Sequence, residues 1–382
     1  MIKIIRATTV PQSLDDFCRG VLSELSKKYE VIGLSSPGPE LEEVATREGV
    51  RVMAVPMERR ISVIKDCKSL WRVWRTFRKE NPTMVHSMTP KAGMLCMVGA
   101  WLAHVPVRVH TFTGLVFPTT SGLKRRVLMF TDWLTCACAT HVIPEGEGVK
   151  NDLISYGITK KPMRILGYGN VKGVDLEHFR RTNVVLNAAE RIKNNLLFTF
   201  LFVGRVVRDK GINELIAAFI KLYQSYPRIR LILVGQYEND LDPINVVAQD
   251  SIERHKGIIA VGKKTGMDLL AYYAASDCFV FPSYREGFPN TVLEAGAMGL
   301  PSIVTDINGS REIIVGGENG MIIPPKNTDA LYQAMLNMME NKELREKMAG
   351  NARGMIASRF EQGFVRKCLY EFYEAVLPTE KD

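Results

Sequence analysis

Short β-branched runs alternate with longer amphipathic runs along most of this 382-residue chain, and the alternation starts afresh in its second half. Such βαβα order predicts parallel sheets with helices on both faces. Strands are expected in the first half at 2–6, 30–34, 50–54, 84–87, 107–111, 140–143 and 163–166. Strands are expected in the second half at 197–203, 230–234, 257–261, 277–281 and 301–304. We therefore predict an α/β fold with two doubly wound, Rossmann-like domains.

Residues 167–194 separate the two alternating regions, because they are glycine-rich and then polar, with no run that could form a buried strand. We assign 1–166 to an N-terminal domain, 167–194 to a linker and 195–358 to a C-terminal domain. The length suits this division at about 150 residues per domain. Ligands of open α/β sheets bind beyond the carboxyl ends of the strands, so a cleft between the domains is the expected site.

The charge balance indicates an anionic partner. The chain has 50 Lys and Arg against 41 Asp and Glu, a net charge of +9. An excess of this size suits nucleic acid, a nucleotide, a phosphate ester or a membrane surface, and it does not choose among them.

The cysteine pattern and the apolar runs bear on the compartment. Seven scattered cysteines without a CxxC pair predict neither a disulfide framework nor a zinc site, and they favour a reducing, cytoplasmic setting. The first residues, MIKIIRATTVPQ, read as a β-strand and not as a signal peptide. The most apolar internal stretch, 94–107, is too short to span a bilayer, so any membrane association is expected to be peripheral.

A basic loop follows the first strand of the second half. That strand ends at Gly204, and a helix is expected to begin near Ile212, which places Arg205 and Lys210 on the connecting loop. Arginine can grip a phosphate with two parallel hydrogen bonds, lysine adds a point charge, and a helix N-terminus adds backbone N–H groups. The loop is thus a candidate diphosphate clamp, with a solvated basic loop as the alternative.

Two glutamates flank the start of a later helix. Glu286 lies in the loop after strand 277–281, and Glu294 lies about one turn into the helix that begins near Asn290. Both carboxylates could face a ligand above the sheet, where they would accept hydrogen bonds from vicinal sugar or ribose hydroxyls. Gly287 would allow close backbone approach to a phosphate. A capped surface helix with incidental acids is the alternative.

Taken together, these motifs resemble the retaining, nucleotide-sugar-dependent glycosyltransferases of family 4, which have the GT-B architecture. The likeness covers nearly the whole chain and is most specific in the second half. The segments that carry it are FVGRVVRDKG, AASDCFVFPSYREGFPNTVLEAGAMGLPSIVTD, ENGMIIPP and MMENKELREKMAGNARGMIASRF. The N-terminal segment KAGMLCMVGAWLAHVPVRVHTFTGLVF resembles bacterial members that build capsule or O-antigen polysaccharide on a lipid carrier. The resemblance also implies that the last helix, about 361–378, returns to the first domain.

The resemblance implies a role for each matching position. Arg205 and Lys210, after Gly204, would bind the donor diphosphate, and Glu294 would hold the ribose hydroxyls. Glu286, together with the backbone of the run that follows it, would contact the transferred sugar and the distal phosphate. The implied donor-site residues also include Gly262, which would border the base, and the run Gly287, Phe288, Pro289 and Asn290. His110, at the end of a strand of the first domain, would approach the donor sugar at the reaction centre, although from the residues alone a structural histidine is the alternative.

Two features bear on cofactors. Many family members have a glycine pair after the first strand, near the diphosphate, whereas this chain departs from that pattern with Ala7-Thr8-Thr9 and no glycine before Gly20. The one D-x-D string, at 240–242, falls in a polar turn, and the six histidines show no metal-ligand spacing. We therefore expect no metal and no cofactor.

The segment 61–79 is a candidate membrane-facing helix. A period of 3.6 residues gathers Lys65, Lys68, Arg72, Arg75 and Lys79 on one face. The apolar residues Ile64, Cys67, Leu70, Trp71, Trp74 and Phe77 fall opposite, where they would pack on the sheet. The basic face, with 124–126, would either be solvated or lie against anionic lipid. No nucleic-acid-binding motif accompanies it, so nucleic acid is the least favoured partner.

The resemblance thus implies a retaining glycosyltransferase, which we expect to be cytoplasmic and peripheral on the inner face of the cytoplasmic membrane. It would move a sugar from a nucleotide-sugar, with UDP as the favoured carrier, to a lipid-linked (polyprenyl diphosphate) or glycan acceptor. Two alternatives stay open. A GT-B sugar-nucleotide epimerase would need acids and histidines arranged for proton abstraction, and a non-catalytic protein would bind the nucleotide-sugar or anionic lipid without turnover.

Overall fold

The computed structural model describes residues 1–58, 62–238 and 242–378, which form two compact units. The first unit comprises Met1–Lys172 and the chain from Gly363 onward, and the second comprises Gly173–Gln362. The division falls within the predicted linker 167–194 and next to the start of the last helix.

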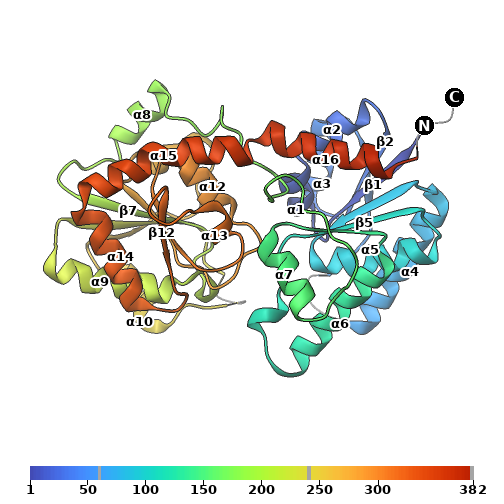
Figure 1. The fold of residues 1–382 in the computed structure, drawn as a ribbon, viewed down its shortest axis with the longest axis horizontal. Coiled ribbons are helices and arrows are strands. Elements are labelled where there is room, and N and C mark those ends of the chain that lie inside the picture. Colours follow the sequence, from blue (N-terminus) through green and yellow to red (C-terminus); the bar gives the residue numbers. More distant parts are fainter. Residues whose placement is uncertain (59–61, 239–241, 379–382) are drawn as a thin grey trace. The chain divides into compact units, whose positions relative to one another are not determined.

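The first unit is a parallel six-stranded sheet in the order β3-β2-β1-β4-β5-β6. Its strands are β1 Lys3–Ala7, β2 Glu30–Ser35, β3 Arg51–Ala54, β4 Met84–Met88, β5 Val107–Phe112 and β6 His141–Pro144. Its helices are α1 Pro11–Cys18, α2 Val21–Ser26, α3 Pro39–Glu48, α4 Val63–Glu80, α5 Pro90–Leu102, α6 Gly122–Cys138 and α7 Glu147–Ser155. Helices α4, α5 and α6 pack side by side on one face of this sheet (Figure 1).

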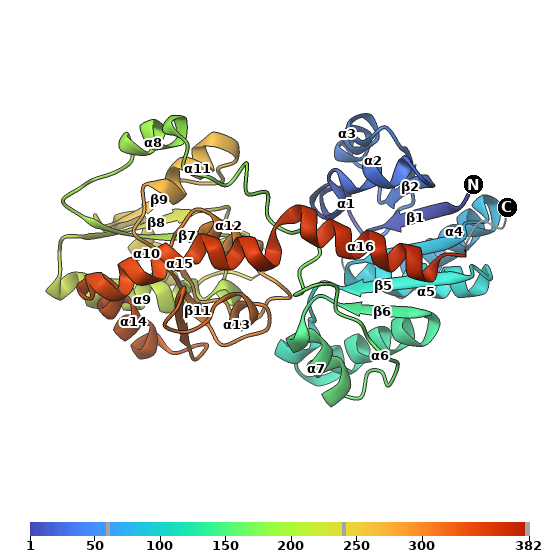
Figure 2. The ribbon, with the colours of Figure 1, turned by 45° about the horizontal axis from the view of Figure 1, so that its top comes forward.

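The second unit repeats the arrangement with the order β12-β11-β10-β7-β8-β9. Its strands are β7 Phe198–Val203, β8 Ile229–Val234, β9 Ile258–Ala260, β10 Cys278–Phe281, β11 Ser302–Thr305 and β12 Gly320–Ile323. Its helices are α8 Asn183–Glu190, α9 Ile212–Ser225, α10 Val246–Arg254, α11 Gly266–Ala274, α12 Asn290–Ala297, α13 Ser310–Ile313, α14 Thr328–Glu340 and α15 Lys342–Phe360. Figure 2 shows helices on both sides of this sheet, so the doubly wound α/β prediction is confirmed for both units.

Four local predictions were wrong. The run 163–166 forms no strand and contributes only a single bridge between Met163 and Val142. The amphipathic run at about 14–28, which predicts a single helix, contains parts of two helices, α1 and α2, because Gly20 adopts a left-handed φ of 70° between them. Strand β12 was missing from the prediction, which ended the second sheet with the strand 301–304. Helix α8 lies inside the predicted linker, where it is capped by the Thr182 side chain and buries Val185.

Helix α4 is rotated relative to the prediction. It buries a narrow stripe of Ser69, Val73, Phe77 and Glu80. Ile64, Cys67 and Trp71, which were expected to pack on the sheet, are exposed, and the remaining predicted apolar residues are partly buried or buried. The reason is that Ser69 and Val73 bring the helix close to its neighbours, and the Val73 side chain packs where a Cβ on Gly99 of α5 would lie, 2.8 Å from Val73 Cγ1.

The last helix, α16 (Gln362–Val376), belongs to the first unit apart from its first residue, as predicted. It lies beside β1 in Figure 2, and its apolar residues Leu369, Phe372 and Tyr373 join the core around β1 and β4. At the centre of this contact, the Arg6 guanidinium is fully buried without a carboxylate partner among the described residues. Its Nη1 lies 2.6 Å from the Tyr373 hydroxyl and 3.0 Å from Nδ1 of His86.

Replacing Tyr373 by Phe is expected to destabilise the first unit, because a buried guanidinium then loses its hydroxyl partner, which costs about 1–3 kcal/mol. The midpoint of thermal unfolding should fall by several degrees. Tyr370→Phe on the same helix is the matched control, since the Tyr370 hydroxyl is buried without a hydrogen-bond partner in the described structure. Equal midpoints for the two variants would show that Arg6 does not depend on Tyr373.

Candidate active site

The strand order places the candidate site in the second unit. Strands β7 and β10 are neighbours at the centre of the sheet, and the chain proceeds from β7 toward one edge and from β10 toward the other. This is a topological switch point, where the loops at the carboxyl ends diverge and leave room for a ligand. The loop after β7 carries Arg205 and Lys210, and the loop after β10 carries Glu286. The structure therefore brings together motifs that are about 80 residues apart in the sequence.

Two glycines allow these loops to touch. Gly211 has φ of 72°, and a Cβ there would lie 2.0 Å from the carbonyl oxygen of Pro282 in the β10 loop. Gly309, after β11, has φ of 73°, and its Cβ would lie 2.4 Å from the carbonyl oxygen of Gly287. No side chain fits in either place, and both conformations favour glycine. The backbones after β7, β10 and β11 therefore pack directly against one another.

This contact joins Lys210 to Glu286. Lys210 Nζ forms an ion pair with Glu286 Oε1, and both side chains are largely buried. The hydroxyl of Ser283, directly after β10, donates to the same carboxylate oxygen at 2.7 Å. The Lys210 ammonium also lies 5.4 Å from the centre of the Phe281 ring. Lys210, predicted to bind the diphosphate, and Glu286, predicted to contact the sugar, thus form one ion pair.

Arg205 also has a carboxylate partner, Glu238. Its Nη1 lies 2.7 Å from Oε2 of Glu238, which follows β8. Both predicted phosphate ligands, Arg205 and Lys210, are therefore paired with carboxylates. Because a diphosphate can replace a carboxylate in the same hydrogen-bond geometry, these positions suit an anion that exchanges with the acids.

Glu294 lies on α12, and its carboxylate has a partner that sequence reasoning missed. The Tyr273 hydroxyl, on α11, donates to Glu294 Oε2 at 3.0 Å. Tyr273 is fully buried, and burial raises the pKa of its phenol well above the ordinary value, so it stays a neutral donor. In the sequence, Tyr273 looks like one more apolar residue of an amphipathic helix, so no signal pointed to it.

The other predicted donor-site residues lie in the segments that follow β7, β9 and β10. Gly204 ends β7, and Gly287, Pro289 and Asn290 lead into α12. Phe288 points into the core, where its ring lies 5.3 Å from that of Phe360, so only its backbone is available to a ligand. The carbonyl of Gly262 accepts from the N–H of Gly235 at 3.0 Å, next to the end of β8.

The D-x-D string is partly outside the described residues, since only Asp242 is described. Its carboxylate accepts from Arg208 Nε at 2.9 Å and from the backbone N–H of Asp209 at 2.7 Å, which is the role of a turn-stabilising residue. Within 1–58, 62–238 and 242–378, no cluster of three or more His, Cys, Asp or Glu side chains could hold a metal ion.

His110 belongs to the first unit, near the carboxyl end of β5. It is 1% exposed, and burial lowers the pKa of its imidazole to about 3, so the ring is neutral at physiological pH. Its Nδ1 lies 2.8 Å from Oγ of Ser87 on the neighbouring strand β4.

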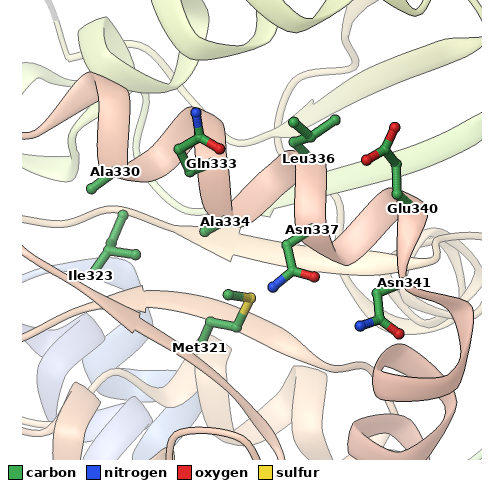
Figure 3. A pocket seen from close by; sticks show the side chains of 9 residues that line it. All are labelled: Met321, Ile323, Ala330, Gln333, Ala334, Leu336, Asn337, Glu340 and Asn341. Atoms are coloured by element: carbon green, nitrogen blue, oxygen red, sulfur yellow. The ribbon is translucent and has the colours of Figure 1, made fainter.

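A separate hollow lies on the second unit between the edge strand β12 and α14 (Figure 3). Met321 and Ile323 line it from β12, and Gln333, Asn337 and Glu340 line it from α14. Its nine lining residues, all within the described structure, include no lysine, arginine or histidine. The hollow therefore lacks the cations that a diphosphate requires.

Comparison with known proteins identifies the family. The model for "Glycosyl transferases group 1" matches residues 187–355, and that for a "Glycosyl transferase 4-like domain" matches 19–169. The chain is 30% identical over 379 residues to the capsular polysaccharide biosynthesis glycosyltransferase CapM of Staphylococcus aureus, covering 98% of this chain and 97% of the relative. The chain therefore belongs to the family 4 (group 1) glycosyltransferases and is a nucleotide-sugar-dependent glycosyltransferase.

Another relative is the UDP-Gal:α-D-GlcNAc-diphosphoundecaprenol α-1,3-galactosyltransferase of Escherichia coli. It is 32% identical over 326 residues, which cover 82% of this chain and 81% of the relative. Among solved structures, Anabaena HepE in complex with UDP and glucose superposes with a TM-score of 0.80 at 17% identity, over 98% of this chain and all of the other. The GT-B fold is thus confirmed.

The same comparison also finds a putative UDP-N-acetylglucosamine 2-epimerase from Listeria monocytogenes. It superposes with a TM-score of 0.62 at 17% identity, over 100% of this chain and 97% of the other. The fold is therefore shared with an epimerase, and it does not by itself decide the reaction. In the parts of the chain that the structure describes, no helix is both long and apolar enough to cross a membrane.

Tyr273→Phe is expected to raise the KM for the nucleotide-sugar several-fold, because the Glu294 carboxylate loses a neutral buried donor that fixes its orientation. Steady-state kinetics with varied donor would measure the change. Tyr272→Phe is the matched control, because the Tyr272 hydroxyl has no hydrogen-bond partner in the described structure. If the donor KM is unchanged in Tyr273→Phe, the hydrogen bond from Tyr273 to Glu294 does not contribute to donor binding.

Proposed function

We propose that this enzyme is a retaining glycosyltransferase that moves a sugar from a UDP-sugar to a saccharide on a polyprenyl diphosphate carrier, in cell-surface polysaccharide biosynthesis. The observation that carries the proposal is the placement of Arg205, Lys210 and Glu286 on the loops at the switch point of the second unit, with Glu294 on the helix that follows the β10 loop. The full-length likeness to a capsular enzyme and to an enzyme named for UDP-Gal and a diphosphoundecaprenol acceptor supports the choice of substrates.

The chemistry of the leaving group explains why two cations are needed. Departure of a nucleoside diphosphate leaves negative charge on the distal phosphate, and positioned cations stabilise that charge as it develops. Arg205 and Lys210 would exchange their carboxylate partners, Glu238 and Glu286, for diphosphate oxygens. The exchange would release the Glu286 carboxylate toward hydroxyls of the transferred sugar. These two cations would supply the charge without a metal ion.

The remaining assignments follow from the family resemblance. Glu294, oriented by Tyr273, would accept hydrogen bonds from the two ribose hydroxyls. His110 would approach the donor sugar from the first unit. Retention of configuration would result from transfer on the same face of the sugar through an oxocarbenium-like state.

The two alternative functions are disfavoured by how the acids are engaged. An epimerase of this fold would need carboxylates and histidines placed for proton abstraction, whereas Glu286 is paired with Lys210 and Glu294 is held by Tyr273. A non-catalytic binding protein is disfavoured by the chain's membership of a family of nucleotide-sugar-dependent glycosyltransferases.

Glu294→Gln is expected to lower kcat/KM for the UDP-sugar about 10- to 100-fold, because hydrogen bonds to a charged group contribute about 1.5–3 kcal/mol. Release of UDP and transfer to a polyprenyl-diphosphate saccharide would be measured together. Glu253→Gln on the exposed face of α10 is the matched control. Failure of the wild-type protein to release UDP or GDP from any nucleotide-sugar, with any lipid-linked acceptor, would refute the proposal.

We further propose that α4 holds the enzyme on the cytoplasmic face of the membrane, as a peripheral protein. The exposed face of α4 mixes apolar and basic side chains, since Ile64 is 73% and Trp71 is 53% exposed beside Lys68, Arg72 and Arg75. The Arg75 guanidinium lies 5.4 Å from the Trp71 ring centre. A helix of this kind suits an anionic interface, where aromatic rings insert and each nearby basic residue contributes about 1 kcal/mol.

The charge reversal R72E/R75E is expected to abolish co-sedimentation with phosphatidylglycerol vesicles, and wild-type binding should fade as salt rises. Trp71→Ser should weaken binding at both low and high salt, because it removes inserted apolar area. The control R254E/K342E changes the net charge equally but lies in the second unit. Undiminished sedimentation of R72E/R75E would exclude α4 as the membrane-facing element.

A further inference from the structure

Three residues from three different elements surround the His110 ring. Ser87 is directly opposite His110 in the register of β4 and β5, and its Oγ lies 2.8 Å from Nδ1. The ring of Phe112, two residues further along β5, meets the His110 ring edge to face at 4.5 Å between centres. The first turn of α5 closes the third side, at Gly93.

The Ser87 contact bears on which ring nitrogen carries the proton, because the roles of Oγ and Nδ1 depend on the ring tautomer. Ser87 is fully buried, and its hydroxyl hydrogen has no other acceptor among the described residues. A buried hydroxyl that donates nothing is costly, so the arrangement that satisfies it has Ser87 donating to Nδ1 of His110. A neutral imidazole that accepts at Nδ1 carries its hydrogen on Nε2.

This arrangement leaves Nε2–H as a donor without a partner in the described part of the chain. Because the ring is buried, that donor has a strong preference for an acceptor oxygen. The neutral state is favoured further by burial, which lowers the pKa of His110 to about 3. A ring in this state can donate a hydrogen bond to an oxygen of a substrate, and it cannot act as an acid of ordinary histidine strength.

Gly93 provides the space that the ring occupies. A Cβ on Gly93 would lie 2.4 Å from Cε1 of His110, 2.8 Å from Nε2 and 2.9 Å from Nδ1. All three contacts are shorter than non-bonded atoms permit, so any side chain at position 93 must push the ring away. The position of the His110 ring therefore requires a glycine at position 93, in addition to any need for close packing of the helix.

We propose that Ser87 and Gly93 are positioning residues that hold His110 as a neutral hydrogen-bond donor through Nε2, Ser87 by fixing the tautomer and Gly93 by fixing the ring's location. The proposal rests on the proposed role of His110 at the reaction centre. It adds two residues that make no contact with the donor themselves.

The first experiment observes the ring directly and does not depend on activity. In the full-length enzyme with ¹⁵N-labelled histidine, the His110 signals are assigned by their loss in His110→Gln. We expect an unprotonated Nδ1 and a protonated Nε2 between pH 5 and 8. Ser87→Ala should shift the Nδ1 resonance or mix the tautomers, and Ser87→Thr, which keeps the hydroxyl, should restore the wild-type spectrum. A protonated Nδ1 in the wild type would overturn the proposal.

The second experiment measures turnover. Ser87→Ala should lower kcat about 10-fold, the loss of one oriented hydrogen bond, while the KM for the donor stays within about twofold. Ser87→Thr should recover most of the loss. In a His110→Gln background, adding Ser87→Ala should change kcat by less than about twofold, because the two residues act through one contact. Independent, multiplicative losses would overturn the proposal.

Gly93→Ala has a matched control on the same helix. A Cβ on Gly99 of α5 would meet Val73 Cγ1 at 2.8 Å, so Gly99→Ala imposes a similar packing stress away from His110. Gly93→Ala should move the His110 signals and lower kcat, whereas Gly99→Ala should leave both unchanged. Equal effects of the two variants would reduce Gly93 to a packing role and contradict the proposal.

The two experiments separate failure of this proposal from failure of the proposed function. If His110→Gln retains full turnover while the wild-type spectrum shows the Nε2–H tautomer set by Ser87, the catalytic role of His110 is wrong and the positioning stands. If His110→Gln loses turnover while Ser87→Ala leaves both spectrum and kcat unchanged, the positioning is wrong and the role of His110 stands.

Discussion

The candidate site depends on backbones that touch at the switch point of the second sheet. At Gly211 and at Gly309, the absence of a side chain lets the loops after β7, β10 and β11 pack against each other's carbonyl groups. Parallel strands bring their carboxyl ends to one edge, but they do not by themselves bring an ammonium within reach of a carboxylate 76 residues away. The ion pair between Lys210 and Glu286 follows from the contact of Gly211 with Pro282, so the charge arrangement is a consequence of main-chain geometry.

The same geometry gives each of the two candidate phosphate-binding cations, Arg205 and Lys210, a carboxylate partner. Lys210 is largely buried, and an unpaired buried ammonium would be expensive. Glu286 and Glu238 form ion pairs with Lys210 and Arg205. In the proposed function a diphosphate would replace these carboxylates with oxygens of the same kind, so donor binding would exchange one set of charge-assisted hydrogen bonds for another. Arg205 and Lys210 are thus neutralised locally, whereas the exposed Lys68, Arg72 and Arg75 of α4 carry part of the positive excess of the chain.

The charged residues of the candidate site could be predicted from the sequence, because the strand pattern shows where each strand ends and which acidic or basic residues follow it. Arg205, Lys210, Glu286 and Glu294 all lie at the positions that strand-end reasoning assigned. Tyr273 could not be found in this way, because a tyrosine in an apolar helix gives no sign that its hydroxyl reaches a carboxylate on another helix. The role of Gly93 could not be predicted either, because its contact with the His110 ring depends on how α5 packs against β5. The rotation of α4 was mispredicted because Ser69, a polar residue, occupies its buried stripe.

Recognition of a nucleoside diphosphate by the second unit, through Lys210 and its neighbours, can be measured directly. UDP and UMP differ only in the distal phosphate, so both would be titrated calorimetrically into the wild-type enzyme and into Lys210→Met. We expect the wild type to prefer UDP and Lys210→Met to reduce this preference about 10-fold or more, the scale of a charge-assisted hydrogen bond. An identical ratio of UDP to UMP affinity in both proteins would show that Lys210 does not recognise the distal phosphate.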